Sequence, residues 1–329
     1  MGKKKRLAKG IWKVLKQAFA GFSDDKVVKL SAALAYYTVF SIGPMIIVII
    51  YFAGMIYGRE AVQGTIFGQI QGLVGAEAAL QIQDMIKSAA LNKEGSLAAT
   101  LGIITLVIGA TGVFAEIQES INMIWNLKPK PEKGWLKMIV NRLLSFSVII
   151  SLGFILLVSL VLTGLIEALM DRLRASFPNI TLVVVYIVNL LLTFGIITTL
   201  FGVIFKVLPD AVIKWKDVVV GSMVTAVLFM AGKFAITFYI GKSDVGGTYG
   251  AAGSLVVLLL WVYYSSVILY FGAEFTKAYA ANFGSPIHPS KYAVWVKNIE
   301  VEQKAGSLQQ LEEKKQEQND TTGDHVKVT

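Results

Sequence analysis

The sequence predicts an all-α, polytopic membrane protein with six transmembrane helices and with its N- and C-termini in the cytoplasm. Two observations lead to this fold class: six long stretches are free of charge or nearly so, and most Lys and Arg residues lie between alternate stretches. Hydrophobic residues make up 55% of the 329 residues and charged residues only 16%, whereas about 25% of the residues of soluble domains are charged. A soluble fold of this size could not bury so much apolar surface, so lipid must cover part of it.

Each predicted helix is long enough to cross the hydrocarbon core of a bilayer, which takes about 20 apolar residues. The fifth reaches this length only if Lys233 lies inside the span. Helices are expected rather than a β-barrel, because the runs show no alternation of polar and apolar residues and each helix satisfies its own backbone hydrogen bonds. The predicted spans cover residues 31–58, 96–118, 143–166, 180–205, 217–240 and 248–275.

The distribution of basic residues predicts the orientation of these helices. Nine Lys and Arg residues precede the first span, five follow the second, three follow the fourth and seven lie from Lys277 onward, so one side holds 24 of the 31. The other side holds six, and Lys233 is intramembrane. The side with 24 is therefore predicted to be cytoplasmic. Near this inner boundary lie three indole rings that are expected to anchor helices at the interface: Trp125, Trp135 and Trp215.

Three segments outside the spans complete the predicted organisation. Residues 1–30 form a cytoplasmic basic arm, residues 59–95 an external amphipathic segment, and residues 281–329 a polar cytoplasmic tail that is partly disordered. Apolar residues at helical spacing predict an amphipathic helix within the arm: Ile11, Leu15, Ala18, Phe19 and Phe22. This helix either lies on the inner membrane surface or packs on the protein's own cytoplasmic loops.

The net charge of +9 follows from the basic inner face. Such a face attracts anionic lipid headgroups by about 1 kcal/mol for each basic residue near the surface. The expected partners are therefore the lipid bilayer and its anionic headgroups at the N-terminal arm. Nucleic acid is not an expected partner.

Ionisable groups at membrane depth are the candidate functional residues, because burying a charge is unfavourable. Lys233 either extends to the outer headgroups or faces a polar cavity. Glu116 and Glu274 lie near the inner ends of the second and sixth spans. Each is either an interfacial carboxylate beside a basic residue, such as Arg142 or Lys277, or a carboxylate that binds a proton, a cation or a headgroup in an inner vestibule.

Polar and helix-breaking residues add to this list. Gln118, Asn122 and Asn189 would line such a vestibule, although amides also hold membrane helices together. Gly43 and Pro44 predict a kink in the first span, because proline removes a backbone donor and clashes with the preceding turn. The kink is either a gate or a packing feature.

Signatures of enzymes are missing from the sequence. It contains no Cys, and its two His residues, His288 and His325, both follow the last span. These residues cannot form a thiolate or His-rich metal site, and no phosphate-binding Walker A motif is present. The protein is therefore not expected to be an enzyme, and no catalytic residue, metal site or cofactor is predicted.

Three stretches, in the right order, resemble one membrane protein family. Residues 32–44 (AALAYYTVFSIGP) resemble the opening signature of the YihY/virulence factor BrkB family, and residues 119–126 (ESINMIWN) resemble its motif at the end of the second span. The last span carries similar motifs at residues 249–254 (YGAAGS), 260–265 (LWVYYS) and 271–274 (FGAE). The resemblance covers residues 25–282 and implies a six-span, multi-pass protein of the bacterial inner (plasma) membrane.

The resemblance carries over no catalytic or binding residue. Members of the family are linked to envelope integrity and have been mislabelled ribonuclease BN, but the His-x-His-x-Asp-His motif of the zinc hydrolases with that name is missing. Nuclease activity is therefore not expected. The first hypothesis is a transporter or flippase of an amphipathic or lipidic substrate that supports envelope integrity. The alternative is an envelope scaffold that does not transport and binds other proteins.

Overall fold

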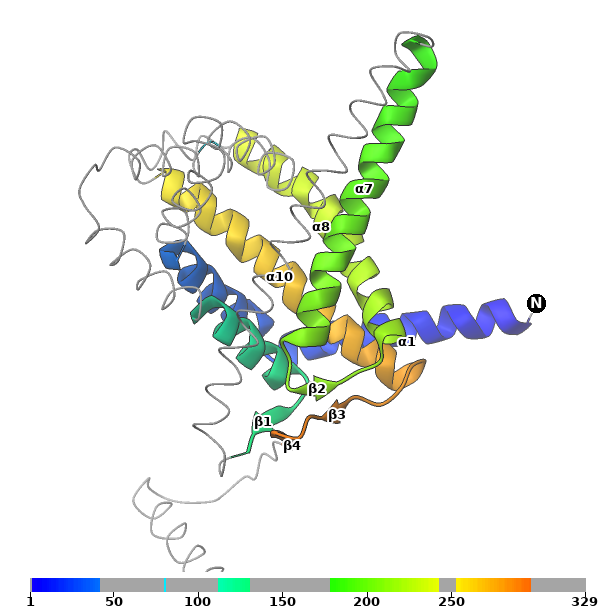
Figure 1. The fold of residues 1–329 in the computed structure, drawn as a ribbon, viewed down its shortest axis with the longest axis vertical. Coiled ribbons are helices and arrows are strands. Elements are labelled where there is room, and N and C mark those ends of the chain that lie inside the picture. The colour runs from blue at the N-terminus through cyan, green and yellow to red at the C-terminus, as the bar shows by residue number, and fades with distance from the viewer. Residues whose placement is uncertain (1, 42–79, 81–111, 131–177, 243–252, 297–329) are drawn as a thin grey trace, which may run out of the picture. The chain divides into compact units, whose positions relative to one another are not determined.

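The computed structural model describes residues 2–41, 80, 112–130, 178–242 and 253–296, with its elements labelled in Figure 1. Residues Met1–Trp295 form one compact unit. The predicted span 143–166, the kink at Gly43 and Pro44, and the external segment 59–95 apart from Leu80 lie outside the described residues. Of the predicted tail 281–329, only residues 281–296 are described.

Three of the described helices are long and apolar enough to cross a membrane: α7 (Pro178–Val207), α8 (Trp215–Lys242) and α10 (Gly253–Asn282). They overlap the predicted spans 180–205 and 217–240 and the described part, residues 253–275, of the predicted span 248–275. A helical membrane protein is thus confirmed, while the total of six spans and the cytoplasmic position of the termini remain predictions. The 30 residues of α10 are about 45 Å long, which exceeds the hydrocarbon core of about 30 Å. Its last turns therefore continue past residue 275, the predicted end of the span.

Helices α8 and α10 approach closely because a glycine on each helix faces a threonine on the other. A Cβ atom at Gly221 of α8 would overlap Thr276 of α10, and a Cβ atom at Gly272 of α10 would overlap Thr225 of α8. Each threonine donates its hydroxyl hydrogen to the carbonyl of the glycine four residues earlier on its own helix, at 2.8 Å and 2.7 Å. Small residues at such positions allow the close backbone contact that stabilises helix pairs in lipid.

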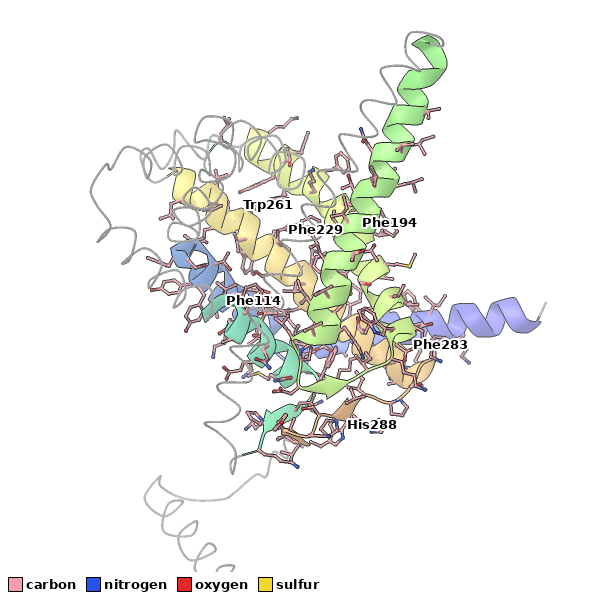
Figure 2. All side chains as sticks on the ribbon, in the orientation of Figure 1. Phe114, Phe194, Phe229, Trp261, Phe283 and His288 are labelled. Carbon is pink, nitrogen blue, oxygen red and sulfur yellow. The ribbon has the colours of Figure 1, made fainter. Side chains whose placement is uncertain are left out.

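The buried core extends from this crossing to α7 and to the helix over residues 112–124. Phe229 of α8 packs edge-to-face on Trp261 of α10 and on Phe201 of α7, with ring centroids 6.0 Å and 5.8 Å apart (Figure 2). Trp125 is only 1% exposed and donates from Nε1 to the carbonyl of Ala273 at 3.1 Å. The prediction that Trp125 is an interfacial anchor is therefore wrong, because its indole fills the protein core.

The amphipathic helix of the arm is present as α1 (Gly2–Asp24). Val14 and Ala18 on its buried face pack with Phe271, Phe275 and Ala278 of α10. The helix thus packs on α10, and its Gly10 also lies against Phe283 just after the end of α10. Three large apolar side chains on the other face remain exposed: Ile11, Trp12 and Phe19. Contact between this exposed face and lipid headgroups remains a prediction.

Short strands join the connections that follow three of the predicted spans. β1 (Leu127–Pro129) pairs antiparallel with β4 (Ala293–Trp295), and β2 (Ala211–Val212) pairs antiparallel with β3 (His288–Pro289). The connections after the second, fourth and sixth predicted spans are therefore hydrogen-bonded to one another and lie on one side (Figure 1). They are the connections that the count of basic residues assigns to a single compartment.

Candidate functional site

Three chain segments meet near the C-terminal end of α10 and form a cluster of charged groups. α1 ends at Asp24, and Asp25 begins a tight turn in which Lys26 has a positive φ of 53°. The helix over residues 112–124 ends beside this turn, with Asn126 in the left-handed conformation at φ 57°, which asparagine tolerates at a helix C-terminus. We call Asp25, Glu274 and Lys277 the inner cluster, after the side of the membrane on which the count of basic residues predicts it to lie.

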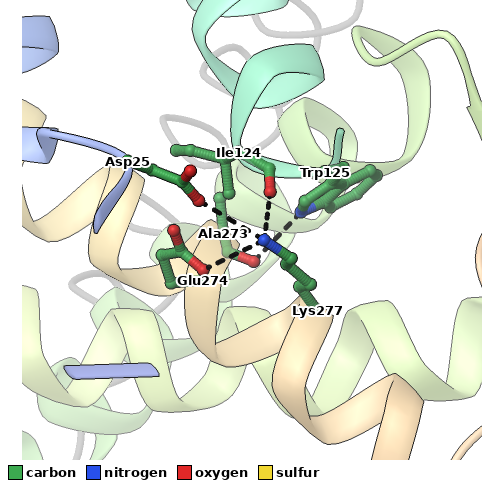
Figure 3. Close-up of polar contacts among 6 residues, drawn as sticks. All are labelled: Asp25, Ile124, Trp125, Ala273, Glu274 and Lys277. Carbon is green, nitrogen blue, oxygen red and sulfur yellow. Dashed lines mark hydrogen bonds and ion pairs between the residues drawn. The ribbon is translucent and has the colours of Figure 1, made fainter. Parts of the chain in front are cut away.

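Lys277 connects the three segments (Figure 3). Its Nζ atom lies 3.4 Å from Oδ2 of Asp25 and 3.8 Å from Oε2 of Glu274, and it donates a hydrogen bond to the carbonyl of Ile124. The carbonyls of the last helical turn have no partner within their own helix and carry partial negative charge, so they suit an ammonium group. One cation thus contacts two carboxylates and the end of a helix.

Glu274 is the most deeply buried member of the inner cluster. The residue is 2% exposed, whereas the side chains of Asp25 and Lys277 are 21% and 30% exposed. Oε1 of Glu274 has no hydrogen-bond donor within the described part of the chain. Gly21 of α1 lies directly over the carboxyl group, and a Cβ atom there would overlap it. The carboxyl group of Glu274 is therefore closed off by α1 and only partly satisfied.

A second polar cluster, the Asp210 cluster, consists of Gln118, Asn122 and Asp210. Asn122 donates from Nδ2 to Oδ2 of Asp210 at 2.8 Å and accepts the backbone N–H of Asp210 at 2.8 Å. Gln118 donates from Nε2 to Oδ1 of Asp210 at 3.3 Å. All three residues are buried. This cluster fixes the connection after α7 to the helix over residues 112–124.

Glu116 lies on the helix over residues 112–124, next to Tyr270. Its Oε1 accepts a hydrogen bond from the hydroxyl of Ser120 at 3.2 Å, and the ring of Tyr270, which is fully buried, lies beside both residues. Tyr270 precedes Glu274 by one helical turn, which is about 6 Å along the axis of α10. Glu116 and Glu274 therefore lie at neighbouring levels near the same end of α10.

Lys233 lies at a different level of the molecule. It follows Gly232 of α8, which packs directly against Tyr264 of α10, and its side chain is half-buried. Tyr264 precedes Glu274 by ten residues, so Lys233 lies about 15 Å from the level of Glu274 along the helix axis. The structure therefore brings Glu116 near the inner cluster but does not bring Lys233 to it.

Two residues of these clusters, Asp25 and Asp210, were not predicted as functional from the sequence. Their contacts with Lys277 and Asn122 join positions 252 and 88 residues apart, so no local pattern marks them. Lys277 was expected, like Arg142, as a basic residue beside a Glu, and the structure places it next to Glu274. Asn189 is exposed on α7 and belongs to neither cluster. Among the described residues, no group of three or more His, Asp or Glu side chains is arranged to hold a metal ion.

Comparisons with known proteins agree with this membrane architecture. The family described as Virulence factor BrkB matches residues 18–292. Proteins named "UPF0761 membrane protein" are similar to this chain: that of Alcanivorax borkumensis is 25% identical over 78% of the chain and 58% of its own length. Those of Stenotrophomonas maltophilia and Pseudomonas paraeruginosa are 26% and 28% identical over 81% and 77% of the chain, and over 60% and 59% of their own lengths. The chain thus spans about three-fifths of these relatives. No solved structure matches it.

Proposed function

We propose that the chain, which belongs to the Virulence factor BrkB family, moves an amphipathic or lipidic molecule across the bacterial cell membrane. By this movement the protein supports envelope integrity. The observation that carries this proposal is the carboxyl group of Glu274. It lies within a helix apolar enough to cross the membrane, is 2% exposed and has an oxygen without a donor within the described residues. Ionisable groups that remain buried at such positions mark ion and substrate pathways in membrane proteins.

The chemistry of the chain favours ion-coupled or passive movement. The sequence contains no Walker A motif for the use of ATP. The inner cluster instead holds the carboxyl groups of Asp25 and Glu274 against the one ammonium group of Lys277. When a cation or a proton binds to these carboxyl groups, the net charge of the cluster becomes more positive. The exposed apolar side chains of α7 and α8 suit an environment of lipid or lipid-like molecules, and include Leu191, Val227 and Phe234.

Reconstitution into liposomes tests this function directly. The movement of fluorescent phospholipids between leaflets and the flux of amphipathic solutes are measured with wild-type protein, with Glu274→Gln and with Glu119→Gln. Glu119 is exposed on the helix over residues 112–124 and serves as the matched control. We expect Glu274→Gln to slow movement about tenfold or more, which corresponds to about 1.4 kcal/mol. Movement no faster than in protein-free vesicles for every cargo would refute the proposal.

The exposed face of α1 favours the second candidate, an envelope scaffold. Trp12 is 71% exposed, and Ile11 is exposed beside it, so this face is free to contact another protein. The test compares cells that carry Trp12→Ser with cells that carry Glu116→Gln, Lys233→Met and Glu274→Gln. The scaffold is favoured when only Trp12→Ser removes an envelope phenotype, and the transporter is favoured when only the charge variants do so. Deletion of residues 1–20 is a poorer test, since it also removes the buried Val14 and Ala18.

A further inference from the structure

The carboxyl groups of Asp25 and Glu274 meet within the inner cluster. Both approach Nζ of Lys277, at 3.4 Å and 3.8 Å, and the two side chains are close enough to share a hydrogen bond. An ionised carboxylate has only acceptor atoms, so two ionised carboxylates cannot bond to each other. A bond between them requires a proton on one of them.

The charges around Glu274 also favour an added proton. Within the described part of the chain, the charged groups that act on Glu274 are Asp24 and Asp25 at the end of α1 and Lys277 on α10. The helix over residues 112–124 contributes the Ile124 carbonyl, which contacts Lys277. It also contributes the carboxylate of Glu116, which lies beside Tyr270, one helical turn before Glu274 on α10. α8 presents the uncharged Gly221 and Thr225 near this level. Negative charge therefore exceeds the single positive charge.

Burial makes this excess charge unfavourable. Glu274 is 2% exposed, and its Oε1 atom has no donor within the described residues, so a charge on that oxygen is removed from bulk solvent and is not compensated by those residues. Gly21 occupies the space above the carboxyl group. Asp25, in contrast, is partly exposed at the turn after α1. The pair thus has one buried carboxyl group and one that solvent reaches.

We propose that Asp25 and Glu274 bind one exchangeable proton between their carboxyl groups, with Asp25 as the route to solvent and Lys277 as the fixed counter-charge. This assignment rests on the proposed transport function. In that function, the proton is the ion whose movement is coupled to movement of the cargo. The proton supplies a donor between two carboxyl groups that hold only acceptor atoms when both are ionised. Its loss leaves two carboxylates that compete for one ammonium group.

Labelling with dicyclohexylcarbodiimide tests the site without any cargo. This apolar reagent adds to a protonated carboxyl group, and rearrangement then leaves a stable N-acylurea that contains all atoms of both reactants. The wild-type protein in lipid nanodiscs is treated across a pH series, and the modified residue is identified by peptide mass spectrometry. We expect modification at Glu274 that decreases about tenfold for each pH unit above the midpoint, as for a single titrating site.

Variants make the test specific. Glu274→Gln should remove the modification at this position, and the exposed control Glu119→Gln should leave it unchanged. Asp25→Asn supplies an amide donor to Glu274 in place of the proton and should reduce the modification at neutral pH at least about tenfold. Lys277→Met removes the counter-charge and should extend the modification to higher pH.

Three outcomes would overturn the proton site. These are no modification of Glu274 at any pH, modification that does not depend on pH, and protection by sodium ions at constant pH, which would assign a sodium site instead. The result is independent of transport: modification without flux in liposomes refutes only the proposed transport, and flux without modification refutes only the proton site.

Discussion

Exchanging the polar groups of Asn122 and Asp210 tests whether the Asp210 cluster stabilises the contact between the connection after α7 and the helix over residues 112–124. Asn122 makes two hydrogen bonds of 2.8 Å to Asp210, one to its carboxylate and one to its backbone N–H, and both residues are buried. Asn122→Ala removes both bonds and leaves the buried N–H without this acceptor. A hydrogen bond to a charged group contributes about 1.5–3 kcal/mol and a neutral one about 1 kcal/mol. We therefore expect the free energy of unfolding to fall by about 3 kcal/mol.

A reciprocal exchange isolates this interaction from general effects on packing. Asn122→Asp places two carboxylates against each other and removes the amide donor, so it should destabilise the protein at least as much as Asn122→Ala. Combining Asn122→Asp with Asp210→Asn restores one donor and one acceptor at nearly unchanged volume. The double variant should therefore be more stable than Asn122→Asp alone by about 2 kcal/mol, within the range seen for residues in direct contact.

The assay is unfolding in mixed micelles by titration with sodium dodecyl sulfate, followed by tryptophan fluorescence. Trp125 is buried one helical turn from Asn122 and reports on the unfolding of this region. Glu119→Ala, on the exposed side of the same helix, should change the free energy of unfolding by no more than about 0.5 kcal/mol. Single effects that add in the double variant to within about 0.5 kcal/mol would show that the residues do not interact, and the reasoning would fail.

Three further perturbations test the packing of the helices. Gly272→Leu should lower the free energy of unfolding by about 1–3 kcal/mol or more because its side chain would enter α8. Gly195→Leu is the control, since no described residue lies within 4 Å of its Cβ position, and it should have little effect in the same titration. Trp125→Phe removes the hydrogen bond to the Ala273 carbonyl and should lower the free energy of unfolding by about 1–3 kcal/mol. A variant as stable as the wild type would show that this bond does not stabilise the fold. Deletion of residues 2–24 uncovers the apolar surface of α10 that α1 buries and should lower the unfolding midpoint in detergent, while an unchanged midpoint would mean that α1 does not dock.

The positions of α7, α8 and α10 could be predicted from the sequence because each is a nearly uninterrupted apolar run. Such runs have no other stable environment than lipid or a protein core. In lipid, a run without alternation of polar and apolar residues favours a helix over a β-barrel strand. The predicted span 180–205 lies within α7, which covers Pro178–Val207. The end of α10 was harder to predict because residues 276–282 remain helical beyond the apolar run. Among these residues, Ala278 and Tyr279 pack in the cluster that contains Val14 and Ala18 of α1, a contact that the local sequence does not contain.

The partners of the predicted polar residues could be derived only where they are close in sequence. Lys277 follows Glu274 by three residues, and helical geometry places the two on one face. Asp25 and Asp210 reach Lys277 and Asn122 from distant segments, so only the assembled fold shows these contacts. The same limit applied to α1, whose spacing predicted an amphipathic helix but not whether lipid or protein covers its apolar face.

Satisfaction of hydrogen bonds separates the roles of the two clusters. Gln118 and Asn122 direct their amide donors at Asp210, and the Asp210 backbone donates in return. A buried polar network satisfied in this way holds its members in one arrangement, so we assign these residues to the stability of the fold. Glu274 differs, because one of its oxygens has no donor within the described residues and a second carboxyl group lies beside it. A site that is incomplete in this way gains most from binding a proton, and for that reason we place the chemistry at Glu274 rather than at the amides.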